Sequence, residues 1–214
     1  INCAAYTQVD KAETEKQRAY AVNELGVANL VKASSKDTRI IHVSTDFVFD
    51  GSAQQPYKTD AATNPLGIYG ASKLAGELIL QEQAPQRSTI VRTAWLYAEQ
   101  GQNFLQTMLR LMQTRDELKV VNDQHGTPTA AHELAKALWA FADKPEHKGI
   151  YHWSNTGEAT WYEFACEIQQ QAWDRELLTR KIPIIPITTA DYPTPAKRPA
   201  YSVLEKSATW AALG

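Results

Sequence analysis

Apolar and polar residues alternate along the chain in blocks that predict helices and strands in turn. Residues 9–35 carry Ala, Leu and Val at helical spacing, and residues 38–44 (TRIIHVS) are typical of a short buried strand. Residues 51–63 are polar and predict a loop. A helix is predicted over residues 65–83, because Asn64 can act as its N-cap and Pro65 suits its first position.

The same alternation continues toward the carboxyl end. Strands are predicted at 88–96, 118–121 and 149–153, and helices at 103–112, 131–142 and 161–173. Residues 182–187 (IPIIPI) contain two prolines, which restrict them to an edge strand or an extended segment. The proline-rich tail beyond them is predicted to be irregular. Strands that alternate with helices of ten or more residues indicate the α/β class, with a Rossmann-like parallel sheet covered by helices on both faces.

Composition narrows the class of protein further. The chain has 214 residues, 43% of them hydrophobic and 21% charged, and its 22 Lys and Arg nearly balance 24 Asp and Glu. This balance does not suggest nucleic acid as a partner, and no apolar run reaches the ~18 residues that a membrane span needs. Only two cysteines are present, which argues against a disulfide framework. We therefore expect a soluble cytoplasmic protein.

Tyr69 and Lys73 (YGASK) are the first candidates for chemistry. They are four residues apart in a predicted helix, so both side chains lie on one face. A neighbouring ammonium group lowers the pKa of a phenol, which would make Tyr69 a usable proton donor to a carbonyl group. The spacing alone is also common among solvated surface pairs, so it needs support from elsewhere in the chain.

Thr45 supplies that support. It follows the predicted strand IIHVS, and in open α/β sheets ligands bind at the carboxyl ends of the strands. Its hydroxyl could polarise the carbonyl group that Tyr69 protonates. The alternative is that Thr45 caps a turn or a helix through the same hydroxyl.

Eight stretches together carry a family resemblance. They are NCAAYTQVDKAE (2–13), STDFVFDG (44–51), YGASKLAGE (69–77), RTAWLY (92–97), NFLQTMLRL (103–111), VVNDQHGTPT (120–129), GIYH (149–152) and YPTPAKRP (192–199). A strand that ends in Ser-Thr, followed some two dozen residues later by Tyr-x-x-x-Lys, resembles the active site of the extended short-chain dehydrogenases. Within them, the full set resembles the dTDP-4-dehydrorhamnose reductase family, whose members reduce a 4-keto sugar nucleotide.

The resemblance implies roles for individual residues. Thr45 would polarise the 4-keto group, Tyr69 would donate the proton, and Lys73 would lower the Tyr69 pKa and bind the nicotinamide ribose. NADPH would supply the hydride, with NADH left open. The remaining residues that the resemblance places beside the cofactor are Ala4, Ala5, Tyr6, Ser44 and Asn23, although Asn23 could equally be a structural helix residue.

The substrate, a dTDP-4-keto sugar, would contact a second group of residues. The resemblance places Thr7, Val9, Phe47 and Trp95 near the sugar, with core packing as the alternative for Trp95. Arg198 would clamp the diphosphate, or else be a solvated surface residue. Asn103 would contact substrate or cap a helix. No histidine shows the spacing of a metal ligand, so no metal is expected.

Two features depart from the family pattern. Phe47 stands where the STDYVF form of the motif has a tyrosine, so one hydroxyl contact would be lost. The chain also contains no Gly-x-x-Gly-x-x-Gly turn for the cofactor diphosphate. We therefore expect a fragment that lacks the amino-terminal βαβ part and is inactive alone. Residues 1–98 would be the remainder of the dinucleotide-binding domain, with the catalytic residues. Residues 99–214 would be mainly the substrate-binding portion, interleaved with the last Rossmann elements.

Two other functions are compatible with the sequence. The chain could be a binding or regulatory subunit that keeps this fold without turnover, similar to the regulatory subunit of methionine adenosyltransferase. It could also be a reductase or epimerase of another nucleotide sugar. The sequence leaves the oligomeric state undecided, with a homodimer among the options.

Overall fold

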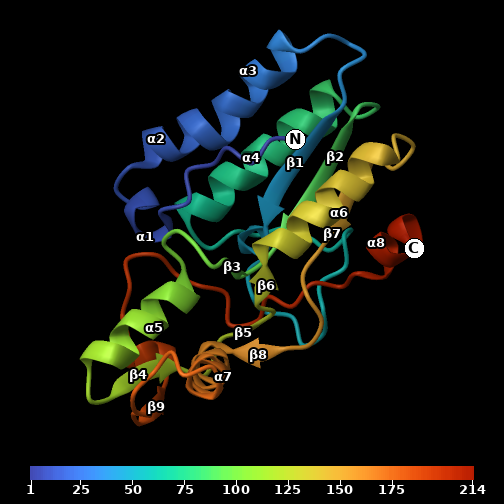
Figure 1. Ribbon diagram of the computed structural model, residues 1–214. Coiled ribbons are helices and arrows are strands. Elements are labelled where there is room, and N and C mark those ends of the chain that lie inside the picture. The colour runs from blue at the N-terminus through green and yellow to red at the C-terminus, as the bar shows by residue number, and fades with distance from the viewer.

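A three-stranded parallel sheet forms the centre of the larger lobe. The computed structural model describes residues 1–214, and its sheet has the order β1 (Ile40–Thr45), β2 (Ser88–Thr93) and β7 (Gly149–His152). The register pairs Thr45 with Thr93, so the carboxyl ends of β1 and β2 lie at the same edge (Figure 1). The predicted α/β class with a parallel sheet is confirmed.

Helices cover both faces of this sheet because side chains along each strand alternate between the two faces. On one face, Ile40 and Ile90 pack with Leu80 of α4 (Ile68–Gln83) and Val27 of α3 (Gly26–Ala33). On the other face, the cluster includes Ile41, Val91, Leu134, Leu138, Phe141 and Ala212, which come from the sheet, α6 (Ala131–Asp143) and α8 (Ser207–Leu213). The even-numbered residues of β1 and β2 therefore face α4.

The segment from Val9 to Ala33 is not the single helix that its apolar spacing predicts. It comprises α1 (Val9–Ala12), α2 (Lys16–Tyr20), one π-helical turn (Ala21–Leu25) and α3. Before it, the strand-like residues 1–6 pair with the sheet only through a bridge between Asn2 and His42. The apolar spacing therefore predicted the helical character of this segment but not its breaks.

Helix α4 begins three residues later than predicted. Its N-cap is Gly67 rather than Asn64, and the Ile68 N–H donates to Oε1 of Glu13 at 2.8 Å. A carboxylate from a distant segment thus satisfies one of the free N–H groups that every helix leaves at its start. The expected cap at Asn64 is therefore wrong, because this tertiary contact stabilises a later start.

The smaller lobe lies below the sheet in Figure 1, and its segments come both before and after β7 in the chain. It contains α5 (Phe104–Thr114), α7 (Trp161–Asp174) and the parallel pair β4 (Leu118–Val121) and β9 (Ile184–Ile187). The strand at 184–187 confirms the predicted edge strand. Two short pairs link the lobes: β3 (Leu96–Tyr97) with β6 (Thr129–Ala130), and β5 (His125–Gly126) with β8 (Ala159–Thr160).

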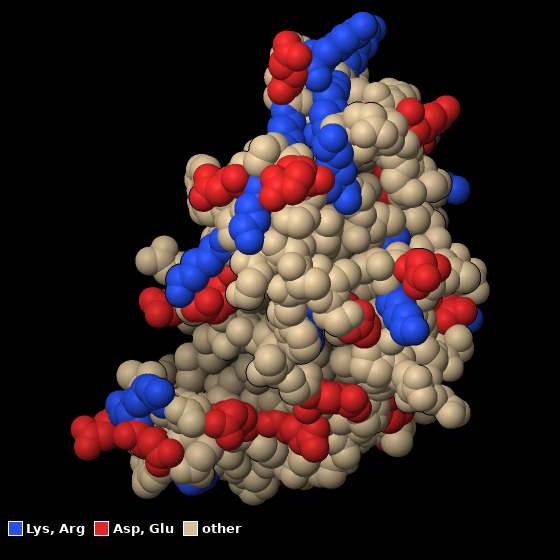
Figure 2. Space-filling model, turned by 90° about the vertical axis from the view of Figure 1, so that its right-hand side faces the viewer, with Lys and Arg blue, Asp and Glu red and all other residues tan.

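Two short 3-10 helices, Asp46–Val48 and Thr189–Asp191, complete the fold. The tail is less irregular than its prolines predict, because it ends in α8, which packs with α6 on one face of the sheet. No helix is long and apolar enough to cross a membrane. The face drawn in Figure 2 carries both signs of charge, with Lys and Arg gathered at one end and acidic side chains banded across the other.

Candidate active site

Thr45 lies buried at the carboxyl end of β1, where the chain turns into the 3-10 helix Asp46–Val48. Its hydroxyl donates to Oδ1 of Asp46 at 3.0 Å and accepts from the Phe47 N–H at 3.2 Å. The capping role that the sequence left as an alternative is therefore present. Since a hydroxyl has one proton and two lone pairs, capping leaves that proton able to turn from Asp46 toward a ligand.

Tyr69 lies in the first turn of α4, with its ring edge-on to Phe47 at 5.4 Å between centroids. Gly70 permits this approach, since a Cβ there would lie 2.1 Å from the Phe47 carbonyl oxygen. Burial, with a smaller contribution from the Asp46 carboxylate, raises the pKa of Tyr69 to about 12, although the nearby Thr45 hydroxyl acts in the opposite direction. Tyr69 is thus a protonated phenol at neutral pH, as a proton donor must be.

Lys73 lies one helical turn further on and is 2% exposed. Its Nζ donates to the Val43 carbonyl oxygen at 2.7 Å and lies 3.4 Å from Nε2 of His42. Burial lowers the pKa of Lys73 to about 8, although Glu77 acts to raise it. The expected lowering of the Tyr69 pKa by Lys73 is therefore not found: burial raises that pKa, the Thr45 hydroxyl is the group that opposes it, and the lysine is directed at the β1 backbone.

The predicted cofactor residues separate into two kinds. Ala4 is exposed, Ala5 is half-buried, and both end the segment beside β1. The side chains of Ser44 and Asn23 instead make internal contacts. Ser44 donates to Oε1 of Glu77. The Asn23 amide accepts from the Tyr6 N–H at 2.8 Å and donates to the Tyr6 carbonyl oxygen at 3.1 Å and to the Ser72 hydroxyl at 2.9 Å.

Three buried residues around this site were not predicted from the sequence: Glu77, Arg92 and His42. Glu77 forms a bidentate ion pair with Arg92, with Oε2 at 2.7 Å from Nη2, and both are at most 2% exposed. The third, His42, contacts Lys73. Glu77 lies four residues after Lys73 and eight after Tyr69, so helical spacing could have placed it on the same face. His42 is at an even position of β1, and alternation along the strand could have directed it toward α4.

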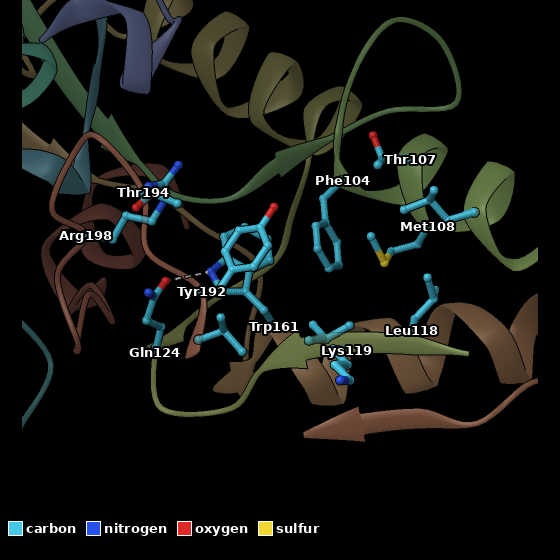
Figure 3. A pocket seen from close by; sticks show the side chains of 13 residues that line it. Phe104, Thr107, Met108, Leu118, Lys119, Gln124, Trp161, Tyr192, Thr194 and Arg198 are labelled. Atoms are coloured by element: carbon cyan, nitrogen blue, oxygen red, sulfur yellow. Dashed lines mark hydrogen bonds between the residues drawn. The ribbon is translucent and has the colours of Figure 1, made fainter. Parts of the chain in front are cut away.

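A cavity of about 490 Å³ opens between the smaller lobe and the tail. Figure 3 shows Phe104 and Met108 on one side of it and Arg198 and Thr194 on the other, with Trp161 and Tyr192 between them. Trp161 donates from Nε1 to Oε1 of Gln124 at 3.2 Å. An apolar cavity with a few polar groups is typical of a small-molecule site.

Of the predicted substrate residues, Arg198 alone lines this cavity, Trp95 contacts the lining residue Trp161, and Phe47 lies against Tyr69 instead. Trp95 stacks on Trp161 with ring centroids 3.5 Å apart and an angle of 8° between the planes. Arg198 lines the cavity and forms a bidentate ion pair with Asp10 of α1, with Nη2 at 2.8 Å from Oδ2. Asn103 caps α5 by accepting from the Gln106 N–H at 3.1 Å. Thr7 is exposed and Val9 half-buried, close in sequence to Asp10.

Comparison with known proteins identifies relatives along the whole chain. The family model described as the RmlD substrate binding domain matches residues 1–214. A dTDP-4-dehydrorhamnose reductase of Sinorhizobium fredii is 44% identical over 211 residues, which are 95% of this chain and 70% of the relative. The spore coat polysaccharide biosynthesis protein SpsK of Bacillus subtilis is 41% identical over 209 residues, 97% of this chain and 71% of the relative.

Solved structures agree with these relatives. The dTDP-4-dehydrorhamnose reductase of Bacillus anthracis in complex with NADP superposes with a TM-score of 0.91 and 38% identity, over 98% of this chain and 72% of that one. A Clostridium acetobutylicum dTDP-4-dehydrorhamnose reductase gives a TM-score of 0.89 and 42% identity, over 96% of this chain and 70% of that one. The chain therefore belongs to the dTDP-4-dehydrorhamnose reductase family and matches its RmlD substrate binding domain from end to end.

Proposed function

We propose that this protein reduces the 4-keto group of dTDP-4-dehydro-L-rhamnose to a hydroxyl, giving dTDP-L-rhamnose, with NADPH as the reductant. The observation that carries the proposal is the convergence of Thr45, at the carboxyl end of β1, with Tyr69 and Lys73 of α4. Members of its family with 44% identity carry the name of this activity.

Tyr69, Thr45 and Lys73 each have a different role in the reduction of the keto group. Tyr69 is a phenol at neutral pH and donates its proton to the keto oxygen. The Thr45 hydroxyl turns from Asp46 to the same oxygen and stabilises the negative charge that develops on it. NADPH, when bound, supplies the hydride that forms the new bond to carbon 4. Lys73, one helical turn further on, has a pKa of about 8 and is mostly protonated at neutral pH, so it can then pass a proton to the phenolate that remains.

The residues present fit the nicotinamide end of NADPH. Ala4 and Ala5 have small side chains and lie at the accessible end of the segment beside β1, so a flat ring can approach the backbone there. Lys73 and Tyr69 would hold the ribose and the ring between them. Because Ser44 and Asn23 are occupied by Glu77 and by Tyr6, we assign them to the support of this site rather than to contacts with the cofactor.

The cavity of the smaller lobe fits the nucleotide. Phe104, Met108 and Trp161 offer apolar and aromatic surface for the base, and Arg198 offers a guanidinium for the diphosphate. Trp95, stacked on Trp161, would then border the sugar. This arrangement supports the assignment of residues 1–98 to dinucleotide binding and catalysis and of residues 99–214 mainly to the substrate.

Replacement of Tyr69 by phenylalanine tests this function. The ring packs against Phe47, so Tyr69→Phe keeps the fold while it removes the proton donor. We expect kcat to fall by roughly 10²- to 10⁴-fold with little change in melting temperature. The assay follows oxidation of NADPH by a dTDP-4-keto sugar, with protein expressed from the complete reading frame that encodes this chain. Near-normal turnover by this variant would rule the mechanism out and favour a non-catalytic subunit or another acid.

A further inference from the structure

The Asn2 side-chain amide has hydrogen-bond neighbours on both sides, and they fix its orientation. Oδ1 of Asn2 accepts the Ala4 N–H at 3.1 Å. A backbone N–H can only donate, so the oxygen must face it and the amide nitrogen must point the other way. That nitrogen, Nδ2, lies 2.9 Å from Nδ1 of His42. Asn2 therefore presents a donor to His42.

This donor selects one form of the imidazole. Because Nδ1 accepts from Asn2, it carries no proton, and the neutral ring must carry its proton on Nε2. His42 is fully buried, and burial together with the adjacent Lys73 lowers its pKa to about 3, so the ring stays neutral. Its Nε2–H is then directed at Nζ of Lys73, 3.4 Å away.

The surroundings of Lys73 are complementary to a neutral amine. An amine can accept the Nε2–H through its lone pair and donate one N–H to the Val43 carbonyl oxygen at 2.7 Å, whereas an ammonium would set two donors against each other. The other titratable groups around Lys73 are Glu77 and Tyr69, from its own helix, and Cys3, from the amino-terminal segment. Glu77 and Cys3 favour the ammonium form, but less than burial disfavours it.

We propose that His42 is a positioning residue for Lys73: Asn2 holds it in the Nε2–H form, and that N–H weakens the hold of the lysine on its proton. The side chains of residues 2, 42 and 73 thus form one line of contacts from the amino-terminal segment through β1 to α4, fully buried at His42 and Lys73. This inference deepens the proposed function and rests on it for its purpose. A lysine that exchanges its proton near neutral pH can return a proton to Tyr69 after each turnover.

Nuclear magnetic resonance tests the proposal without any measurement of activity. In the ¹⁵N-histidine-labelled chain, the signals of His42, assigned among five histidines with His42→Gln, should show the neutral Nε2–H form from pH 5 to 9. In the Asn2→Ala variant, the Nδ1–H form becomes available, and its Nε2 lone pair can accept from the Lys73 ammonium. We expect the proton affinity of Lys73, followed by ¹³C shifts of Cε, to rise roughly 3- to 10-fold.

Backbone contacts protect the fold in this variant, because the Asn2 N–H still donates to the Ile41 oxygen at 2.7 Å and the Asn2 oxygen still accepts from the Val43 N–H at 3.1 Å. Asn29→Ala, an exposed asparagine on α3, is the matched control and should change neither signal. An Nδ1–H form of His42 in the unmodified chain, or an unchanged Lys73 titration in Asn2→Ala, would overturn the proposal. Neither result depends on whether the protein is a reductase.

Discussion

At the scale of single residues, burial decides how the titratable groups around Thr45 behave. Asp46 is 2% exposed, and one of its carboxylate oxygens, Oδ2, has no hydrogen-bond partner. Burial raises the pKa of Asp46 to about 6, although the Ser202 and Thr45 hydroxyls and two backbone N–H groups oppose the shift. Asp46 thus carries a free-energy cost whenever it ionises in the folded protein.

The stability of the protein should therefore depend on pH through Asp46. The folded pKa of Asp46 lies above the unfolded one. The stability that protonated Asp46 contributes is therefore fully present below pH ~4 and is lost as pH rises through about 6. Asp46→Asn cannot ionise and removes this loss. Between pH 4 and 8 the free energy of unfolding of the variant, measured with urea, should gain about 1–3 kcal/mol relative to the unmodified protein.

Asp50 gives this experiment a control of opposite sign. Hydrogen bonds from Ser52 lower the pKa of Asp50 to about 2, so its contribution to stability is present above pH ~4 and is lost as pH falls further. Asp50→Asn should therefore lose stability relative to the unmodified protein as pH rises from 2 to 5. A constant difference between Asp46→Asn and the unmodified protein over pH 4–8 would show that Asp46 ionises normally.

Trp95 is the second residue whose role depends on its immediate neighbour. It adopts a φ of 47° and stacks on Trp161, which lines the cavity. Stacking on a sugar binds ground and transition states similarly, so Trp95→Ala should raise KM about tenfold and lower kcat much less. Steady-state kinetics check this, with Trp139→Ala, 65% exposed on α6, as the control. An unchanged KM would assign Trp95 to packing against Trp161 alone.

At the scale of elements, the approach of α4 to β1 determines the site. Helix α4 contacts the 3-10 helix that follows β1 at Gly70, where a Cβ would lie 2.1 Å from the Phe47 oxygen, and the π-helical turn at Gly76, where it would lie 2.2 Å from the Asn23 oxygen. Both contacts are with backbone atoms, which cannot move aside as a flexible side chain can. Glycine at these two positions lets the helix carry Tyr69 and Lys73 to the sheet.

Gly70→Ala should therefore move α4 away from β1. We expect a loss of about 1–3 kcal/mol in the free energy of unfolding, as for other overpacked sites, and a fall in kcat because Tyr69 moves with the helix. Gly26→Ala is the matched control: its Cβ would lie 3.6 Å from the Ala21 oxygen, an ordinary contact, so alanine should stabilise α3 by about 0.5–1 kcal/mol. Equal melting temperatures for the two variants would contradict the close approach at Gly70.

At the scale of the whole molecule, the ion pair between Asp10 and Arg198 joins the amino-terminal segment to the tail beside the cavity. The Arg198 guanidinium lowers the pKa of Asp10, and both side chains are partly exposed, at 40% for Asp10 and 26% for Arg198. Such a pair adds little to stability in water. Its position in the cavity wall makes ligand binding the better measure of its role.

Arg198→Gln should weaken binding of dTDP by roughly 10- to 100-fold, because a diphosphate loses a charged, bidentate partner. Asp10→Asn keeps the guanidinium and removes a competing carboxylate, so dTDP should bind at least as tightly as before. Isothermal titration calorimetry with dTDP compares the two variants. If Asp10→Asn weakens dTDP binding as much as Arg198→Gln, Arg198 acts by joining the two segments and not by holding the diphosphate.

The sequence by itself determined the α/β class, most of the strands and helices, and the family, because these follow from short-range periodicity and from motifs read in order. Periodicity alone was sufficient at residues 118–121 and 161–173, where the structure has a strand and a helix almost as predicted. Tyr69 and Lys73 share a helical face for the same local reason.

Only the tertiary structure decided which groups meet at the end of β1. Glu13 accepts from the first N–H of α4, at Ile68, across 55 residues of sequence. Lys73 donates to the Val43 oxygen and lies against His42, which are 30 and 31 residues away. Burial then raised the pKa of Tyr69, although its spacing from Lys73 predicted a lower one. Desolvation and contacts between distant segments arise only when the chain packs, so no local pattern in the sequence encodes them.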